Sequence, residues 1–152
     1  MTPAGQPAAP SARETSELRE HLAQQHAGLA RHGAEVVRDW RQRFRKGVLP
    51  FGLVRLGGES NTLLRWRCTG AGCHPRGGRF ELEQAGELIA GLPAAVRTRI
   101  LDVEKVRIEL NYRYALAAYA LARLDDLERH RTALAQLRRS GAAANSDHSR
   151  RV

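Results

Sequence analysis

Residues 62–69, TLLRWRCT, decide the fold of this chain because large apolar side chains alternate there with arginines. Successive side chains of a strand point to opposite faces. Leu64, Trp66 and Cys68 therefore form one face, and Leu63 lies on the other face with the two arginines. The segment predicts a strand with one buried face and one basic face.

The flanking residues complete a small antiparallel sheet. Residues 51–56 form a short apolar run, and the turn-rich sequence GGESN at 57–61 connects this run to the strand at 62–69. This arrangement predicts a β-hairpin. A glycine-rich loop follows over 69–78, and residues 79–82 are expected to add a short third strand.

A long helix is expected before the hairpin. Ser11 and Glu14 have the spacing of a capping box, and Arg45, Lys46 and Gly47 are typical of a helix end. Gly28 and Gly33 weaken this helix without breaking it. Its apolar face is formed by Leu18, Leu22, Leu29, Val36, Trp40 and Phe44.

Two further helices are expected after the hairpin. A short helix is predicted over 83–90, and Pro93 suits the first turn of a long helix that extends to about Arg139. The apolar stripe of the long helix is Val103, Val106, Leu110, Tyr114, Ala117, Leu121, Leu124, Leu127, Leu134 and Leu137. Asn111, which is unfavourable in mid-helix, is expected either in a polar network with Glu109 and Arg113 inside the helical pair or exposed to solvent.

The predicted fold is mainly α with a small β-segment: two long antiparallel helices flank a two- or three-stranded hairpin and a short helix. The two helical stripes bury each other because helices gain most of their stability from an apolar face. Leu22, Leu29, Val36 and Trp40 are expected to face Val103, Leu110, Leu121 and Leu124. The expected organisation is a disordered arm at 1–10, one domain at 11–139 and a disordered tail at 140–152.

Charge is concentrated in the middle of the chain. Residues 38–79 hold ten basic and two acidic side chains, a net charge of +8, whereas the whole chain carries +9. A concentrated basic surface attracts polyanions. The candidate nucleic-acid-binding residues are Arg41, Arg45, Lys46, Arg55, Arg65, Arg67 and Arg76.

The basic strand face favours DNA or RNA as the partner. A two-stranded ribbon fits the major groove of DNA, where arginine reads guanine and contacts phosphates. The same pattern also occurs on sheet edges that are protected from aggregation. Two alternatives stay open: a basic face that meets an acidic protein partner, and a solvated face without a specific partner.

The sequence predicts no catalytic site, no metal and no cofactor. Cys68, Cys73 and His74 lack the further ligands of a zinc site, and no nucleotide-binding glycine motif or nucleophile elbow is found. No apolar stretch is long enough to span a membrane, and no signal peptide precedes the first helix. We therefore expect a cytoplasmic protein with free thiols.

The strand at 63–67, the glycine-rich loop, the short acidic helix and the helix that carries Val103 to Asn111 resemble a bacterial family of unknown function. That family is encoded on integrative and conjugative elements, and some of its members carry the label integrase regulator. The resemblance covers residues 15–138. It implies an accessory protein of a mobile genetic element and carries over no catalytic residue.

A looser similarity links the hairpin to the arm-type DNA-binding modules of recombinases, from which the long flanking helices depart. The resulting hypothesis is a non-enzymatic DNA-binding accessory protein that contacts DNA through its basic β-segment. The alternative is a protein-interaction scaffold that uses the long helix. Homodimerisation through that helix is a further expectation.

Overall fold

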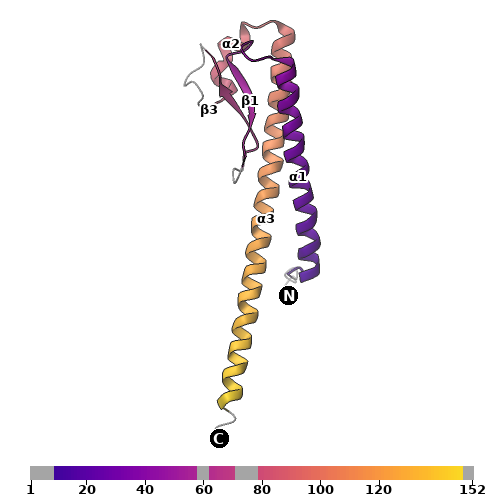
Figure 1. Cartoon of the computed structure of the whole chain (residues 1–152), viewed down its shortest axis with the longest axis vertical. Coiled ribbons are helices and arrows are strands. Elements are labelled where there is room, and N and C mark those ends of the chain that lie inside the picture. Colours follow the sequence, from indigo (N-terminus) through magenta and orange to yellow (C-terminus); the bar gives the residue numbers. More distant parts are fainter. Residues whose placement is uncertain (1–8, 58–61, 71–78, 149–152) are drawn as a thin grey trace, which may run out of the picture. The chain divides into compact units, whose positions relative to one another are not determined.

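The computed structural model describes residues 9–57, 62–70 and 79–148, and it confirms a mainly helical fold in which long helices flank a small antiparallel sheet (Figure 1). In chain order the elements are α1 (Ala12–Arg43), β1 (Phe51–Arg55), β2 (Leu64–Cys68), β3 (Arg79–Phe80), the 3₁₀ helix η1 (Leu82–Ala85), α2 (Gly86–Ala90) and α3 (Ala94–His148). The helix α3 continues beyond its expected end at Arg139, and Gly141 lies within it. A single glycine therefore did not terminate it.

The chain forms two compact units. The central unit is Ala23–Ala118 and contains the sheet, whereas the terminal unit combines Met1–Leu22 with Tyr119–Val152.

The first turn of α1 is capped as the sequence predicts. The Ser11 backbone N–H donates to the Glu14 carboxylate at 2.6 Å, and the Glu14 N–H donates to the Ser11 hydroxyl at 3.2 Å. Hydrogen bonding of the Glu14 carboxylate to Ser11 lowers the pKa of this carboxyl, and the bond from the Ser11 backbone N–H is the largest cause. The predicted capping box is confirmed.

In the terminal unit, α1 meets α3 through polar contacts. The Thr15 side chain is fully buried and accepts a hydrogen bond from Arg131, and Arg19 forms ion pairs with Asp125 and Glu128 at 2.5 and 2.7 Å. Leu124 is buried. Leu18 is exposed, so its predicted place on the buried face is wrong; Thr15 and Arg19 make the contacts with α3 instead.

The sheet of the central unit has the order β1-β2-β3, with both pairs antiparallel. Leu53 on β1 and Phe80 on β3 are both opposite Trp66 on β2. The predicted alternation is confirmed for Leu64, Trp66 and Cys68, all of which are buried. The expected third strand is also present.

Leu63 departs from the predicted pattern because it is buried rather than exposed. It lies before the first residue of β2, so the strand alternation does not set its direction. A Cβ atom added to Gly33 of α1 would lie 2.7 Å from the Leu63 side chain. The glycine therefore leaves the space in which Leu63 packs.

The core lies between the sheet and the two long helices of the central unit, which run antiparallel there (Figure 1). Val37 and Trp40 of α1 belong to the same buried cluster as Ile100 and Leu110 of α3. The Trp40 ring contacts the Trp66 ring with centroids 4.9 Å apart. The predicted burial of the two helical stripes against each other is confirmed in this unit.

Asn111 completes the hydrogen bonding of β2. Its side-chain oxygen accepts from the backbone N–H groups of Leu63 and Leu64 at 3.1 and 2.8 Å, and its amide donates to the Leu64 carbonyl at 2.8 Å. Of the predicted polar network, Glu109 and Arg113 form an exposed ion pair at 2.6 Å. Asn111 thus bonds to the sheet and not to those two residues.

Cys68 is disulfide-bonded in the structure, so the expectation of free thiols is wrong for this residue. That expectation came from the assumed compartment and not from geometry. The chain has one other cysteine, Cys73, which lies outside the described residues with His74.

Gly33→Ala is expected to destabilise the central unit by about 1–3 kcal/mol, because the added methyl group overpacks against Leu63. Gly28→Ala is the matched control: its Cβ atom would meet only the end of Arg31 at 3.7 Å, so it should stabilise α1 by roughly 0.5–1 kcal/mol. Urea denaturation followed by circular dichroism measures both changes. Equal effects of the two substitutions would contradict the packing of Leu63 at Gly33.

Candidate nucleic-acid interface

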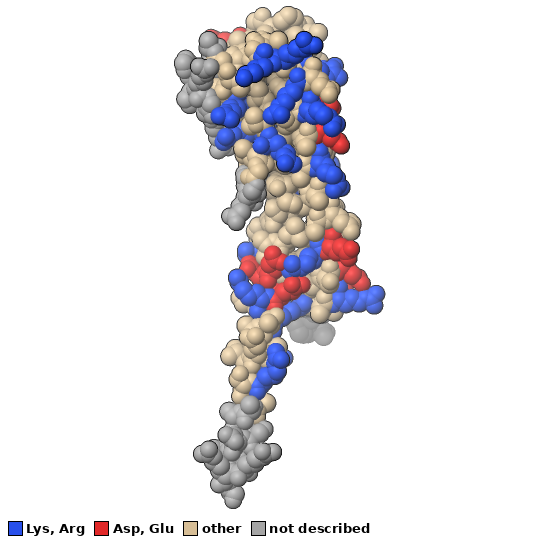
Figure 2. Space-filling model, in the orientation of Figure 1, with Lys and Arg blue, Asp and Glu red and all other residues tan. Residues whose placement is uncertain are grey.

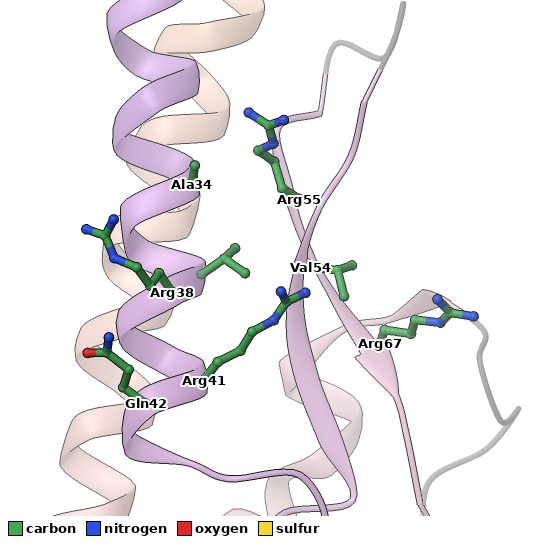
Figure 3. A pocket seen from close by; sticks show the side chains of 8 residues that line it. Ala34, Arg38, Arg41, Gln42, Val54, Arg55 and Arg67 are labelled. Carbon is green, nitrogen blue, oxygen red and sulfur yellow. The ribbon is translucent and has the colours of Figure 1, made fainter.

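A groove of about 700 Å³ lies between the C-terminal half of α1 and the strands β1 and β2. We call it the basic groove and define it by its lining residues: Ala34, Val37, Arg38, Arg41, Gln42, Val54, Arg55 and Arg67. In Figure 3, Arg41 extends from α1 toward the strands, Arg55 lies across from it on β1, and Arg67 projects from the outer side of β2. Four arginines line the groove, and among the described residues none of the lining side chains is acidic.

In the described part of the chain, three arginines of the groove lack the ion pairs that several other arginines form. Arg19, Arg107 and Arg113 each pair with a carboxylate within their own unit. In the described ranges, Arg38, Arg41 and Arg55 have no such partner. On the face drawn in Figure 2, basic side chains gather over the central unit with few acids, whereas acidic and basic side chains lie close together over the terminal unit. Arg38, Arg41 and Arg55 therefore present positive charge to solvent that no described carboxylate pairs with.

Arg45 and Lys46 lie next to this groove, in the connection between α1 and β1. Both are exposed and line an adjoining cavity of about 330 Å³, which shares Arg41 and Val54 with the basic groove. The connection turns at Gly47, whose φ of 91° is strained for a residue with a side chain. The predicted helix end at Arg45, Lys46 and Gly47 is wrong, because α1 already ends at Arg43. Gly47 lies in the connection, where it returns the chain toward β1 beside the two cations.

Arg65 does not line the basic groove with Arg67, although both lie on β2 and alternate there with Trp66. It is half-buried, its Nε atom is buried without a hydrogen-bond partner in the structure, and it lines a separate cavity of about 170 Å³. Glu81 and Arg107 line that cavity too. The two arginines therefore line different cavities. The alternation of the strand alone does not show this difference.

Beside Arg65, a polar cluster ties β2 to α3. The Trp66 indole N–H donates to the Glu104 carboxylate at 2.7 Å, and Arg107 donates to its two oxygens at 2.6 and 2.9 Å. Burial works to raise the pKa of the Glu104 carboxyl, but the bonds from Arg107 and Trp66 outweigh it, so this pKa lies below its ordinary value. The hydrogen bond with Glu104 is also the main cause that raises the pKa of Arg107. These charges compensate each other and hold the sheet in place.

The structure brings five of the seven predicted residues together around two adjoining hollows: Arg41, Arg45, Lys46, Arg55 and Arg67. Arg65 lies outside this group, and Arg76 lies outside the described residues. Of the polar side chains that line the basic groove, the predicted set lacked Arg38 and Gln42. Arg38 lies three residues before Arg41 and four before Gln42, and both spacings make side chains neighbours on one helix. This spacing is the signal that could have identified Arg38 and Gln42.

Two negative observations concern the described residues alone. Within 9–57, 62–70 and 79–148, no three His, Cys, Asp or Glu side chains gather in a way that could hold a metal ion. Among the same residues, no helix is both long and apolar enough to cross a membrane.

Comparison with protein-family models, with curated proteins and with solved structures finds no match to this chain.

Proposed function

We propose that the protein binds nucleic acid through the basic groove and acts without catalysis as a DNA-binding accessory protein. The observation that carries the proposal is a set of four arginines that line one groove, whose lining holds no acidic side chain among the described residues. Such a surface gains affinity for a polyanion because bound phosphates release condensed counterions. Arginine also suits this role because its planar guanidinium donates two hydrogen bonds to one phosphate.

The geometry favours contacts with the phosphate backbone over base readout. Arg38, Arg41 and Arg55 come from two different elements and surround a groove, whereas a hairpin that reads the major groove presents its side chains from one strand face. Phosphate contacts position a protein on DNA without reading its sequence. We therefore propose binding to DNA with weak sequence preference, and RNA is the alternative polyanion.

The biological setting in this proposal comes from the family resemblance. It is an accessory role on an integrative and conjugative element in the cytoplasm, where the DNA is found. The disulfide at Cys68 is the one observation that points away from a reducing compartment.

Fluorescence anisotropy with a random-sequence duplex tests the proposal at about 50 and 200 mM salt. Arg41→Gln and Arg55→Gln are each expected to weaken binding about tenfold at the lower salt concentration and to reduce the salt slope by roughly one unit. Arg99→Gln, at an exposed position of α3 away from the groove, is the matched control with the same change of charge.

Wild-type protein without affinity for duplex DNA or single-stranded RNA at low salt would contradict the proposal. Equal losses in all three variants would show that net charge, and not the basic groove, determines binding. In either case the scaffold hypothesis, in which the arginines meet an acidic protein, becomes the better account of the groove.

A further inference from the structure

Within the central unit, α3 has a second apolar face that the core does not use. Leu101, Ile108, Tyr112 and Leu116 are 51%, 56%, 68% and 55% exposed. They follow one another at steps of seven, four and four, which places them along one side of the helix. The residues of α3 that enter the core, such as Ile100 and Leu110, lie on a different side.

Single exposed apolar residues are ordinary on protein surfaces, but several large ones along one side of a helix mark an interaction site. This row extends over about four helical turns, at 3.6 residues per turn. No described element of the central unit covers it, because each of its four members is more than half exposed. The face is thus open to a partner.

The charges along one border of this face indicate what the partner is. Asp102, Lys105, Glu109 and Arg113 are exposed there and alternate in sign, so the border carries no net charge. A two-fold axis perpendicular to the helix near Ile108 would bring this border against the same border of a second copy, in reverse order. Glu109 and Arg113 form an exposed ion pair within each helix, and in the dimer each would gain a further partner. Lys105 would meet the partner's Glu109, and Asp102 would meet the partner's Arg113.

The same axis also brings apolar residues of the two copies against each other. Ile108 would lie near its own copy on the axis, and Leu101 would lie opposite the partner's Tyr112. A parallel pair offers no such match, because the charged border would then face the opposite border. There Glu104 and Asn111 are already bonded to the sheet.

We propose that this face binds a second copy of the chain in an antiparallel, two-fold symmetric homodimer. The neutral border lets two strongly basic chains approach each other while the arginines of the basic groove, on α1 and the strands, stay out of the interface. The dimer does not depend on nucleic-acid binding, so the two proposals succeed or fail separately.

Sedimentation equilibrium of the full chain tests the dimer. Wild-type protein is expected to be a dimer, and Ile108→Glu is expected to raise the dimer Kd more than tenfold, because it brings two carboxylates together on the axis. Leu134→Glu is the matched control: Leu134 is an exposed leucine of α3 in the terminal unit, 49% exposed, and its substitution should leave the mass unchanged. Circular dichroism melts show that each variant is folded.

Disulfide cross-linking tests the antiparallel arrangement. Ile108→Cys should cross-link to itself, whereas Leu101→Cys should cross-link only when mixed with Tyr112→Cys. Wild-type protein in the same oxidant accounts for the native cysteines. Lys105→Glu should weaken the dimer roughly tenfold, since symmetry creates the repulsive contact twice, and addition of Glu109→Lys should restore it.

A monomeric wild-type protein at high concentration would overturn the proposal. So would a dimer that Ile108→Glu leaves intact, or self-cross-linking of Leu101→Cys alone, which indicates parallel helices. If the wild type is monomeric and Tyr112→Glu weakens DNA binding, the face belongs to the nucleic-acid interface instead.

Discussion

Trp66→Ala is expected to destabilise the central unit by about 3–5 kcal/mol, the usual range for removal of a large buried aromatic side chain. Trp66 is fully buried in the middle strand of the sheet. Its ring contacts Trp40 on α1 and Phe51 on β1, with centroids 4.9 and 5.6 Å away. Substitution leaves a cavity where α1 and the sheet meet, so urea denaturation should show a large fall in the midpoint.

Trp66→Phe separates packing from hydrogen bonding. Phenylalanine keeps most of the aromatic contacts but loses the indole N–H that donates to Glu104 at 2.7 Å. The Glu104 carboxylate keeps both bonds from Arg107, so we expect a smaller loss of about 1–2 kcal/mol. Far-ultraviolet circular dichroism is the suitable probe, because it does not depend on the tryptophan that is removed. A loss below about 1 kcal/mol for Trp66→Ala would show that the core is not built around this residue.

The fold could be predicted from the sequence wherever a long periodic pattern controls it. The alternation at Leu64, Trp66 and Cys68 predicts the central strand. The apolar stripes of the two long helices, with Trp40 on α1 and Val103 and Leu110 on α3, predict which helix faces are buried. Short-range patterns failed where a tertiary contact overrides them. Leu63 is buried because Gly33, thirty residues earlier in the chain, leaves room for it.

The end of α3 shows another limit of local patterns. Gly141 costs a helix about 1 kcal/mol relative to alanine, which is too little to end one by itself. Helix formers on both sides, including Ala142, continue α3 to His148. A Pro residue, which also clashes with the preceding turn, would have given a reliable end.

The candidate site was predictable as a region but not as a surface. Charge counting finds the +8 segment without any structure. It cannot show that Arg38 and Arg41 on α1 lie across a groove from Arg55 on β1, because this depends on how Gly47 returns the chain after the helix. Nor can it show that Arg65 leaves the strand face toward Glu81 and Arg107.

Asn111→Leu is expected to cost about 2–5 kcal/mol, although leucine forms helices better than asparagine. The reason lies in β3, which has only two residues and pairs with Trp66 and Arg67 of β2. Beyond that point the chain enters η1, so the backbone of Leu64 has no strand beside it on that side. The Asn111 amide takes the place of a strand there, bonding both the N–H and the carbonyl of Leu64.

Leucine at position 111 would leave these two backbone groups without partners. Leu64 is fully buried, so water does not replace the lost bonds easily, and each unsatisfied group costs about 1–3 kcal/mol. Arg99→Leu provides the control for a new leucine on α3, because Arg99 is exposed. Its free energy of unfolding, measured in urea, should stay within roughly 0.5 kcal/mol of wild type.

Asn111→Asp tests the direction of the bonds. An ionised carboxylate at position 111 still accepts from the N–H groups of Leu63 and Leu64. Its second oxygen, however, would face the Leu64 carbonyl, to which the wild-type asparagine amide donates a hydrogen bond. A protonated carboxyl restores that donor, so folding should raise the pKa of this aspartate above its unfolded value. Stability lost at neutral pH should therefore return, relative to wild type, as the pH falls through the raised pKa. Asn111→Leu has no group to titrate, and its deficit should stay constant over the same range; a constant deficit in Asn111→Asp as well would contradict the bond to the Leu64 carbonyl.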